Sequence, residues 1–347
     1  MSVRFRAAWS ALVLLGLGWL GSQPVECQTS SNSPRSTKAG WTPPLTSFGQ
    51  PDLQGVWSNN SATPVERPRA FEGRPLLTDD EVTELQRRAD RIFKDGRSAF
   101  AAGDAVFLAA SANLEQYENP NSTANSVWMV QKQFDNRTSL ITDPPDGRVP
   151  PLTPFAQERQ AVDAARQRRL AASEDLSNPL RCITYGIPRF GGRYGDVDFG
   201  YFEIVQAPGY VVLMMEAIHE ARIIPLDGRP RLSERIRHWN GDSRGRWEGT
   251  TLVIETANFS PKSNFMGAAE NLHLVERFTR VAPETINYEI TLQDPTTWTK
   301  PWTVVIPLRQ SHGRLYEFAC HEGNQSMLGI LAGARAEEQA AESVRSR

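Results

Sequence analysis

Apolar and polar residues alternate in short runs along the second half of the chain. Between residues 198 and 325 these runs are separated by turn-forming pairs such as Pro208-Gly209 and Asp227-Gly228. Alternation with such short links is typical of antiparallel β-strands. A meander of this kind escapes exposed edges most simply by closing into a barrel. We therefore expect an antiparallel barrel core over 198–325, with strands at 201–206, 210–215, 219–226, 250–256, 273–281, 285–293, 302–309 and 315–320.

Helical spacing and capping residues mark the flanking parts of the chain. Thr78, with Glu81 three residues later, forms a capping-box signature ahead of apolar residues at helical spacing. Thr153 followed by Pro154 marks a second start, because proline is favoured at the first helical position. We expect one or more barrel strands and helical decorations within 51–197, and a C-terminal helix and tail within 326–347. The expected helices cover 78–98, 153–172 and 326–342.

The first 27 residues carry the pattern of an export signal. Arg4 and Arg6 precede an apolar run over 11–21 that is too short to span a bilayer comfortably. We expect this segment to be cleaved, which leaves no stable membrane anchor and places the mature protein in the periplasm or outside the cell. The polar stretch 28–50 lacks apolar periodicity and predicts a flexible leader.

Gly55-x-Trp57 in the opening strand, ahead of such a meander, resembles the start of a lipocalin-type barrel. Five segments also resemble a family of exported, largely uncharacterised bacterial proteins. The resemblance implies an exported protein of mainly β fold, an antiparallel up-and-down β-barrel of lipocalin (calycin) type with helical decorations. It implies no particular reaction. The segments that carry it are 51–57, 139–152, 219–229, 271–278 and 318–324.

Composition and charge exclude several classes of partner. The chain has 347 residues, 39% of them hydrophobic, which is enough to bury a sizeable core. Its 38 Lys and Arg residues nearly balance 40 Asp and Glu residues, and no long run of one sign occurs. We therefore expect neither nucleic-acid binding through bulk charge nor a polybasic membrane anchor.

Two cysteines lie in the part of the chain that is expected to fold, Cys182 and Cys320. An oxidising compartment would allow them to form a disulfide. The alternative is that each is a buried free cysteine, which behaves as a small apolar residue. Their isolated positions do not indicate a zinc ribbon or a CxxC redox centre.

Alternation along the predicted strands points two titratable side chains into the barrel. His219 falls on the apolar face of the run that starts at Leu213, and Glu276 shares a face with Leu274. Burial raises the pKa of a carboxyl group and lowers that of a histidine, which brings both toward the range useful for proton transfer. On the last predicted strand, Glu317 and His321 are further candidates. The predicted catalytic group is His219, Glu276, His321 and Glu317.

The leading hypothesis is an enzyme that needs no nucleotide cofactor, because no phosphate-binding or dinucleotide-binding glycine motif occurs. It would act on a small apolar or aromatic molecule by His219 and Glu276 acid–base chemistry, in an isomerisation, elimination, cyclisation or hydrolysis. One alternative is a non-catalytic binding protein that uses the same cavity. Another is a metal-dependent enzyme in which His219, Glu276 and His321 are the ligands.

A structural alternative exists for each of the buried candidates. Glu276 can pair with an arginine such as Arg222 or Arg277, and His219 can bond a backbone carbonyl within the core. Arg244 lies in the segment 242–247, whose composition predicts a charged surface turn, and its side chain could bind an anionic ligand. Trp298 and Trp302 can either line the rim of a barrel mouth or pack beneath a loop. The candidate ligand-binding residues are Arg222, Arg244, Tyr288, Trp298 and Trp302.

Overall fold

The computed structural model describes residues 41–93, 103–115, 133–189 and 201–345. The predicted signal peptide at 1–27 lies outside the described residues, as does most of the predicted leader. Within residues 41–50, Leu45 forms an isolated antiparallel bridge with Pro51. Among the helices of the described residues, none combines the length and the apolar character needed to span a membrane.

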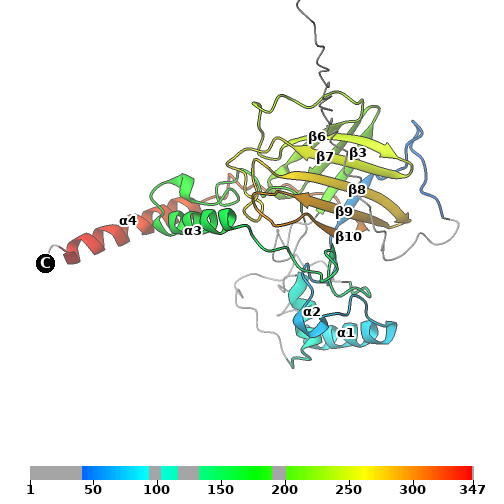
Figure 1. Ribbon diagram of the computed structural model, residues 1–347, viewed down its shortest axis with the longest axis horizontal. Helices are drawn as coiled ribbons and strands as arrows, with labels where there is room; N and C mark the ends of the chain where they lie inside the picture. The colour runs from blue at the N-terminus through cyan, green and yellow to red at the C-terminus, as the bar shows by residue number, and fades with distance from the viewer. Residues whose placement is uncertain (1–40, 94–102, 116–132, 190–200, 346–347) are drawn as a thin grey trace, which may run out of the picture. The chain divides into compact units, whose positions relative to one another are not determined.

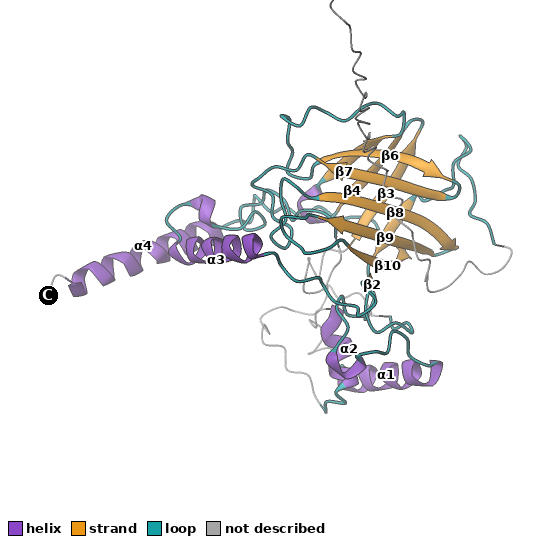
Figure 2. Ribbon diagram, in the orientation of Figure 1, coloured by secondary structure: helices purple, strands orange, loops and turns teal. Residues whose placement is uncertain are grey.

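Ten β-strands form one antiparallel sheet that curls into a nearly closed barrel (Figures 1 and 2). The hydrogen-bonded order is β5-β4-β3-β1-β10-β9-β8-β7-β6, and β2 pairs with β10 beside this path. The prediction of a mainly antiparallel β-barrel with helical decorations is therefore confirmed. The strands are β1 (Gly55–Ser58), β2 (Ile141–Asp143), β3 (Tyr201–Ala207), β4 (Tyr210–Met215), β5 (Ala221–Pro225), β6 (Asp242–Glu248), β7 (Thr251–Ala257), β8 (His273–Ala282), β9 (Thr285–Gln293) and β10 (Trp302–Ser311).

The barrel closes where β5 approaches β6, the two ends of the hydrogen-bonded path. A glycine permits this approach, because a Cβ atom on Gly245 would lie only 2.6 Å from Cδ2 of Leu226 and 3.0 Å from Cγ2 of Ile224. A side-chain hydrogen bond also crosses the gap, from Nη2 of Arg222 to Oγ of Ser243 at 3.1 Å. Side-chain packing and polar contacts thus hold this seam together.

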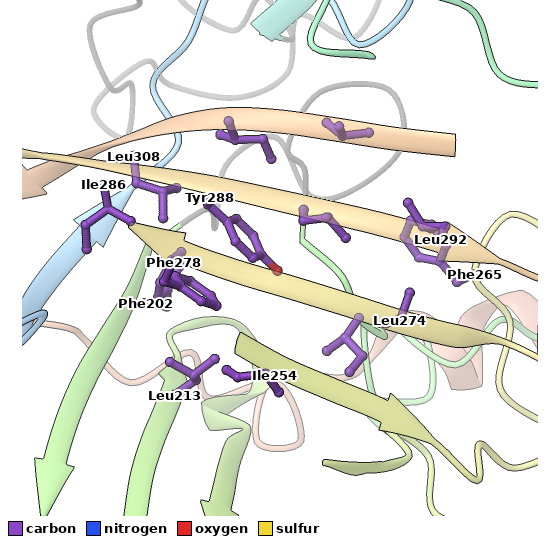
Figure 3. Close-up of a cluster of buried hydrophobic side chains, with 14 of the residues drawn as sticks. Phe202, Leu213, Ile254, Phe265, Leu274, Phe278, Ile286, Tyr288, Leu292 and Leu308 are labelled. Carbon is purple, nitrogen blue, oxygen red and sulfur yellow. The ribbon is translucent and has the colours of Figure 1, made fainter. Parts of the chain in front are cut away.

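Apolar side chains from the strands of the main path fill the barrel, and β6 contributes only the partly buried Trp247 (Figure 3). In β8 and β9, buried and partly exposed positions alternate as expected of strands with one face toward a core. Trp57 and Arg280 lie at the end of the barrel near the β8–β9 turn, where the guanidinium of Arg280 lies 5.5 Å from the centre of the Trp57 ring. At the opposite end Trp298, in the β9–β10 connection, packs edge-on against Trp302.

The helices begin where the capping residues predict. Thr78 Oγ1 accepts a hydrogen bond from the Glu81 backbone N–H at 3.2 Å, and the Glu81 carboxylate accepts one from the Thr78 N–H at 2.8 Å. Thr153 caps the helix that begins at Pro154, also as predicted. The helix that begins at Gly103 was not predicted, and it packs against the first helix in a separate apolar cluster around Phe107. The helices are α1 (Asp79–Ile92), α2 (Gly103–Ser111), α3 (Pro154–Arg169) and α4 (Ser326–Arg345), with short 3-10 turns η1 (Arg69–Phe71), η3 (Ser173–Asp175) and η5 (Ala217–His219).

Two predictions about strands are wrong. The segment 242–247, predicted as a surface turn, forms most of β6. Its inward positions Ser243 and Gly245 are small or polar, so the apolar alternation that signals a strand is missing. Conversely, residues 315–320 form no strand. The preceding strand, β10, is paired on one side with β9 and on the other with β1 and β2, so β10 has no free edge with which residues 315–320 could form a hairpin.

Candidate functional site

A carboxylate is buried in the barrel interior and is held by three hydrogen bonds. Glu276 on β8 is 0% exposed. It pairs with Arg222 on β5, whose Nη1 lies 3.0 Å from Oε1 and whose Nη2 lies 2.6 Å from Oε2. The Tyr288 hydroxyl on β9 donates to Oε1 at 2.5 Å. We call Arg222, Glu276 and Tyr288 the buried triad; Figure 3 shows the Tyr288 ring among the apolar side chains of the core.

Hydroxyl groups satisfy another donor of the triad arginine. Nη2 of Arg222 also lies 3.1 Å from Oγ of Ser243 and 3.1 Å from Oγ1 of Thr256, which themselves are 2.9 Å apart. Burial disfavours the charged guanidinium, but the adjacent Glu276 carboxylate outweighs it and raises the pKa of Arg222. Burial, reinforced by the negative charge of Glu276, raises the pKa of Tyr288 well above its ordinary value. Arg222 therefore stays charged and Tyr288 stays protonated at neutral pH.

The triad has the character of a buried ion pair. Each oxygen of Glu276 meets a nitrogen of the Arg222 guanidinium, so the two opposite charges compensate each other inside the core. The alternative in which Glu276 pairs with Arg222 is confirmed. Arg222 and Tyr288, predicted as ligand-binding residues, are both buried and contact Glu276.

His219 does not share the interior with Glu276. It lies in η5 and is exposed. Ile218 and His219 have left-handed backbone angles, φ 57° and 42°, and the turn they form resets the alternation before β5 begins. As a result Arg222 points inward with 7% exposure and Ile223 points outward with 67%. The prediction that His219 faces the interior is therefore wrong, and the predicted acid–base pair is not assembled.

The other two catalytic candidates lie outside the sheet. Glu317 and His321 are exposed and follow the end of β10 in a segment without strand structure. In the described parts of the chain, no three His, Cys, Asp or Glu side chains are grouped so that they could hold a metal ion. The residues predicted as a metal set, His219, Glu276 and His321, are thus not brought together.

The remaining ligand-binding candidates contact other parts of the protein. Arg244 lies on β6, where it bonds the carboxylate of Asp242 and donates to the backbone carbonyl of Pro230 at 2.9 Å. Trp298 and Trp302 are 1% and 0% exposed, with ring centres 5.4 Å apart. These tryptophans lie in the core, so the prediction that they line an exposed rim is wrong and the alternative of packing beneath a loop holds.

A pocket of about 500 Å³ lies at the barrel end where β6 and β8 begin. Its walls come from the C-terminal half of α3, from the chain between 174 and 186, from Trp239 just before β6, and from residues 261–264 between β7 and β8. We call this the mouth pocket. None of the residues predicted as catalytic or ligand-binding lines it. Its segments are far apart in sequence and share no periodic pattern, and the nearest signal in the sequence is Cys182, which lies within one wall.

The mouth pocket combines aromatic rings with charges of both signs. Tyr185 and Trp239 are half-buried in its lining. Asp175 is bound by Arg166 at 2.6 Å, and this hydrogen bond, with two from backbone N–H groups, lowers the pKa of Asp175. Arg181 and Lys262 place two positive charges in the lining, and the charge of Arg181 contributes to lowering the pKa of the neighbouring Glu174, after hydrogen bonds from its own backbone N–H and from Ser173. Two acidic residues, Asp163 and Glu174, also line the pocket.

Buried and partly buried polar groups connect the lining of the mouth pocket to the start of β5. Thr184 donates to the side chain of Asn240 at 3.1 Å, and Asn240 donates to Glu220 at 3.1 Å. Arg189 lies 3.6 Å from the same carboxylate, and its guanidinium lies 4.8 Å from the centre of the Tyr185 ring. This cluster fixes the orientation of one aromatic wall of the pocket.

Comparison with protein-family models, with curated proteins and with solved structures found no match. Function is therefore inferred from the geometry of the chain's own residues.

Proposed function

We propose that this protein binds a small molecule in the mouth pocket. The observation that carries the proposal is the pocket itself, a concavity of about 500 Å³ lined by two aromatic rings and by charged side chains at one end of the barrel. Ligand sites commonly measure ~300–1,000 Å³, and the mouths of β-barrels are frequent positions for them. A packed scaffold beneath such a site holds its lining residues in place.

The barrel interior is the weaker candidate for a ligand site. Its inward side chains form one continuous apolar cluster, and the buried triad lies within it. The acid–base hypothesis needed a histidine next to Glu276, but His219 is exposed and Glu276 is bound by Arg222. These observations favour a binding protein over a His/Glu enzyme.

The lining chemistry favours an aromatic ligand that carries ionised groups. Trp239 and Tyr185 offer ring surfaces for stacking. Lys262 and Arg181 can attract an anionic group such as a carboxylate or sulfonate, and Asp163 and Glu174 can attract an amine. We propose a small aromatic molecule with at least one charged substituent as the ligand class.

The proposal places the protein in an oxidising compartment, the periplasm or the exterior of the cell. A bonded cysteine pair, Cys182 and Cys320, supports this location, since such bonds persist mainly in exported proteins. The export-signal pattern of the first 27 residues is the second support.

Titration with 8-anilinonaphthalene-1-sulfonate, an aromatic anion whose fluorescence rises on binding, tests the proposal. We expect saturable binding to the unaltered protein, and a dissociation constant at least about tenfold higher in Trp239→Ala and in Lys262→Glu. Trp239→Ala removes a ring surface for stacking, and Lys262→Glu reverses a charge that attracts the anion. Lys300→Glu is the matched control, since Lys300 is exposed and lies outside the pocket lining. Equal affinity in all four proteins would contradict the proposal.

A further inference from the structure

A disulfide lies inside one wall of the mouth pocket. Residues 174–179, 181 and 184–186 line the pocket, and Cys182 lies between them with 3% exposure. Its Sγ is bonded to Sγ of Cys320, 138 residues later in the sequence. The bond therefore attaches the C-terminal part of the chain to the pocket wall.

Noncovalent contacts also hold the wall, among them the hydrogen bond from Arg166 to Asp175 at 2.6 Å. Asn178 donates to the backbone carbonyl of Lys262 at 3.0 Å, and Thr184 donates to Asn240 at 3.1 Å. Between these two contacts the backbone of Cys182 is left-handed, with φ 54°, a conformation that costs free energy in a residue other than glycine. The contacts around Cys182 must hold its backbone in this conformation, and the disulfide is the covalent contact among them.

The C-terminal segment on the other side of the bond is held by a small set of contacts. Asn324 donates to the backbone carbonyl of Leu180 at 2.8 Å, and the Arg335 guanidinium bonds the carbonyls of Leu170 and Ala171 at 2.6 and 2.9 Å. No residue of α4 is buried. Phe318 also lies near Tyr185 of the pocket wall, with ring centres 6.4 Å apart, so the disulfide acts together with this ring contact and a few hydrogen bonds.

We propose that the Cys182–Cys320 disulfide is a redox-sensitive clamp that keeps the mouth pocket in its ligand-binding form. This regulation rests on the proposed function of that pocket. A dithiol reductant would attack Sγ of Cys320, which is half-exposed, and release the Cys182 thiol. The second thiol of the reductant then attacks the mixed disulfide, so that two electrons and two protons convert the bond to two cysteine thiols while the reductant becomes a disulfide.

Reduction loosens the pocket wall without unfolding the barrel. Opening the bond removes the covalent link between the C-terminal segment and the wall, leaves the hydrogen bond from Asn324 to Leu180 as a weaker tie, and lets Cys182 leave its left-handed conformation. The strands need no change, because their pairing is independent of both cysteines. Ligand affinity thus depends on whether the compartment is oxidising.

Hydrogen–deuterium exchange of the full chain, with and without dithiothreitol, tests the clamp directly. We expect amides of residues 174–186 and of α4 to exchange at least tenfold faster after reduction, while those of β8 and β9 keep their rates. Unchanged exchange in 174–186 would overturn the proposal. Equal acceleration in β8 and β9 would overturn it too, because the bond would then stabilise the whole fold rather than the wall.

Cys320→Ser gives an independent test, since Cys320 is half-exposed and its replacement leaves no large cavity. Without reductant this variant should exchange like the reduced protein, and it should not respond to dithiothreitol. The dissociation constant of 8-anilinonaphthalene-1-sulfonate should rise at least tenfold both in Cys320→Ser and in the reduced protein. Equal binding in both redox states would refute the clamp and leave the binding function intact. If reduction accelerates exchange but the probe binds neither the oxidised nor the reduced protein, the binding function and the redox control of affinity are both refuted. The disulfide would then only stabilise residues 174–186 mechanically.

Discussion

At the scale of single residues, the barrel interior contains a pair of opposite charges that apolar packing alone would not tolerate. Taking an unpaired carboxylate out of water costs several kcal/mol, by a rough estimate, so a buried acid needs a counterion and further donors. Arg222 supplies the counterion and Tyr288 the further donor. The pair reaches across strands β5 and β8, and it therefore favours one arrangement of the barrel wall.

Removing one charge of the triad should destabilise the protein far more than removing both. We expect Arg222→Met and Glu276→Leu each to lower the free energy of unfolding by about 3–5 kcal/mol, because each leaves the remaining charge buried without its counterion. The double variant should be closer to the unaltered protein than either single variant. Urea unfolding of the four proteins measures this coupling.

Arg87→Ala provides the surface control, because Arg87 pairs with Glu84 on an exposed helix face, where solvent screens the pair, and its loss should change the free energy of unfolding little. Single triad variants that match this control would contradict the interpretation. The interpretation would also be contradicted if the double variant lost as much free energy of unfolding as the two single variants lose together.

The raised pKa of Tyr288 predicts a loss of stability in alkali. The ordinary tyrosine pKa is 10.0, and burial raises that of Tyr288 well above it. Below about pH 10 both the folded and the unfolded chain keep this hydroxyl protonated, so its stabilising effect is complete. As the pH rises further, Tyr288 ionises first in the unfolded chain, which lowers the free energy of the unfolded state, so the folded state loses stability relative to it.

Tyr288→Phe should be less stable than the unaltered protein by about 1–3 kcal/mol at neutral pH, because Glu276 loses a donor. It should also lose less stability than the unaltered protein above about pH 10, where the unfolded state no longer gains from ionising Tyr288. Urea midpoints on either side of that pH measure both effects. Tyr316→Phe, at an exposed position, is the control, and the same alkaline slope in Tyr288→Phe as in this control would show that Tyr288 does not titrate as a buried group.

At the scale of elements, alternation predicted strands well where one face is consistently apolar. In β8 and β9 the buried positions follow the predicted faces, and Glu276 lies inside as its neighbours indicated. The same argument failed at η5, where two left-handed residues reverse the alternation between β4 and β5. The alternation argument also missed β6. Its segment contains Gly245, which suggests a turn, but this glycine lies within the strand and allows β6 to approach β5 closely. Backbone turns and close approaches of this kind leave no periodic signal.

At the scale of the whole molecule, the strands of the main path follow one another around the barrel in sequence order, with β5 approaching β6 at the seam and the last strand, β10, pairing with the first, β1. β1 lies between β3 and β10, so residues near the start of the described chain pair with residues about 150 and 250 positions later. The mouth pocket is likewise assembled from segments distant in sequence. Local patterns could therefore predict strands and caps, whereas the pocket depends on tertiary contacts that no local pattern encodes.

Because β1 connects the first half of the barrel to the second, its central side chain should affect the stability of the whole sheet. Trp57 is fully buried, its Nε1 donates to the Leu53 carbonyl at 2.8 Å, and Arg280 lies over its ring. We expect Trp57→Ala to lower the free energy of unfolding by about 3–5 kcal/mol, as truncation of a large core aromatic does. Trp57→Phe, which keeps most of the packing but loses the hydrogen bond, should cost less.

Hydrogen–deuterium exchange separates an effect on the whole barrel from a local one. If β1 joins the two halves as its pairing indicates, Trp57→Ala should accelerate exchange in both β3 and β10, which flank β1 on either side. The amides of α1 and α2 should be unaffected, since these helices pack in a separate cluster. Faster exchange confined to β1 would mean that the barrel remains closed without Trp57, and that closure depends on the β5–β6 seam and the buried triad instead.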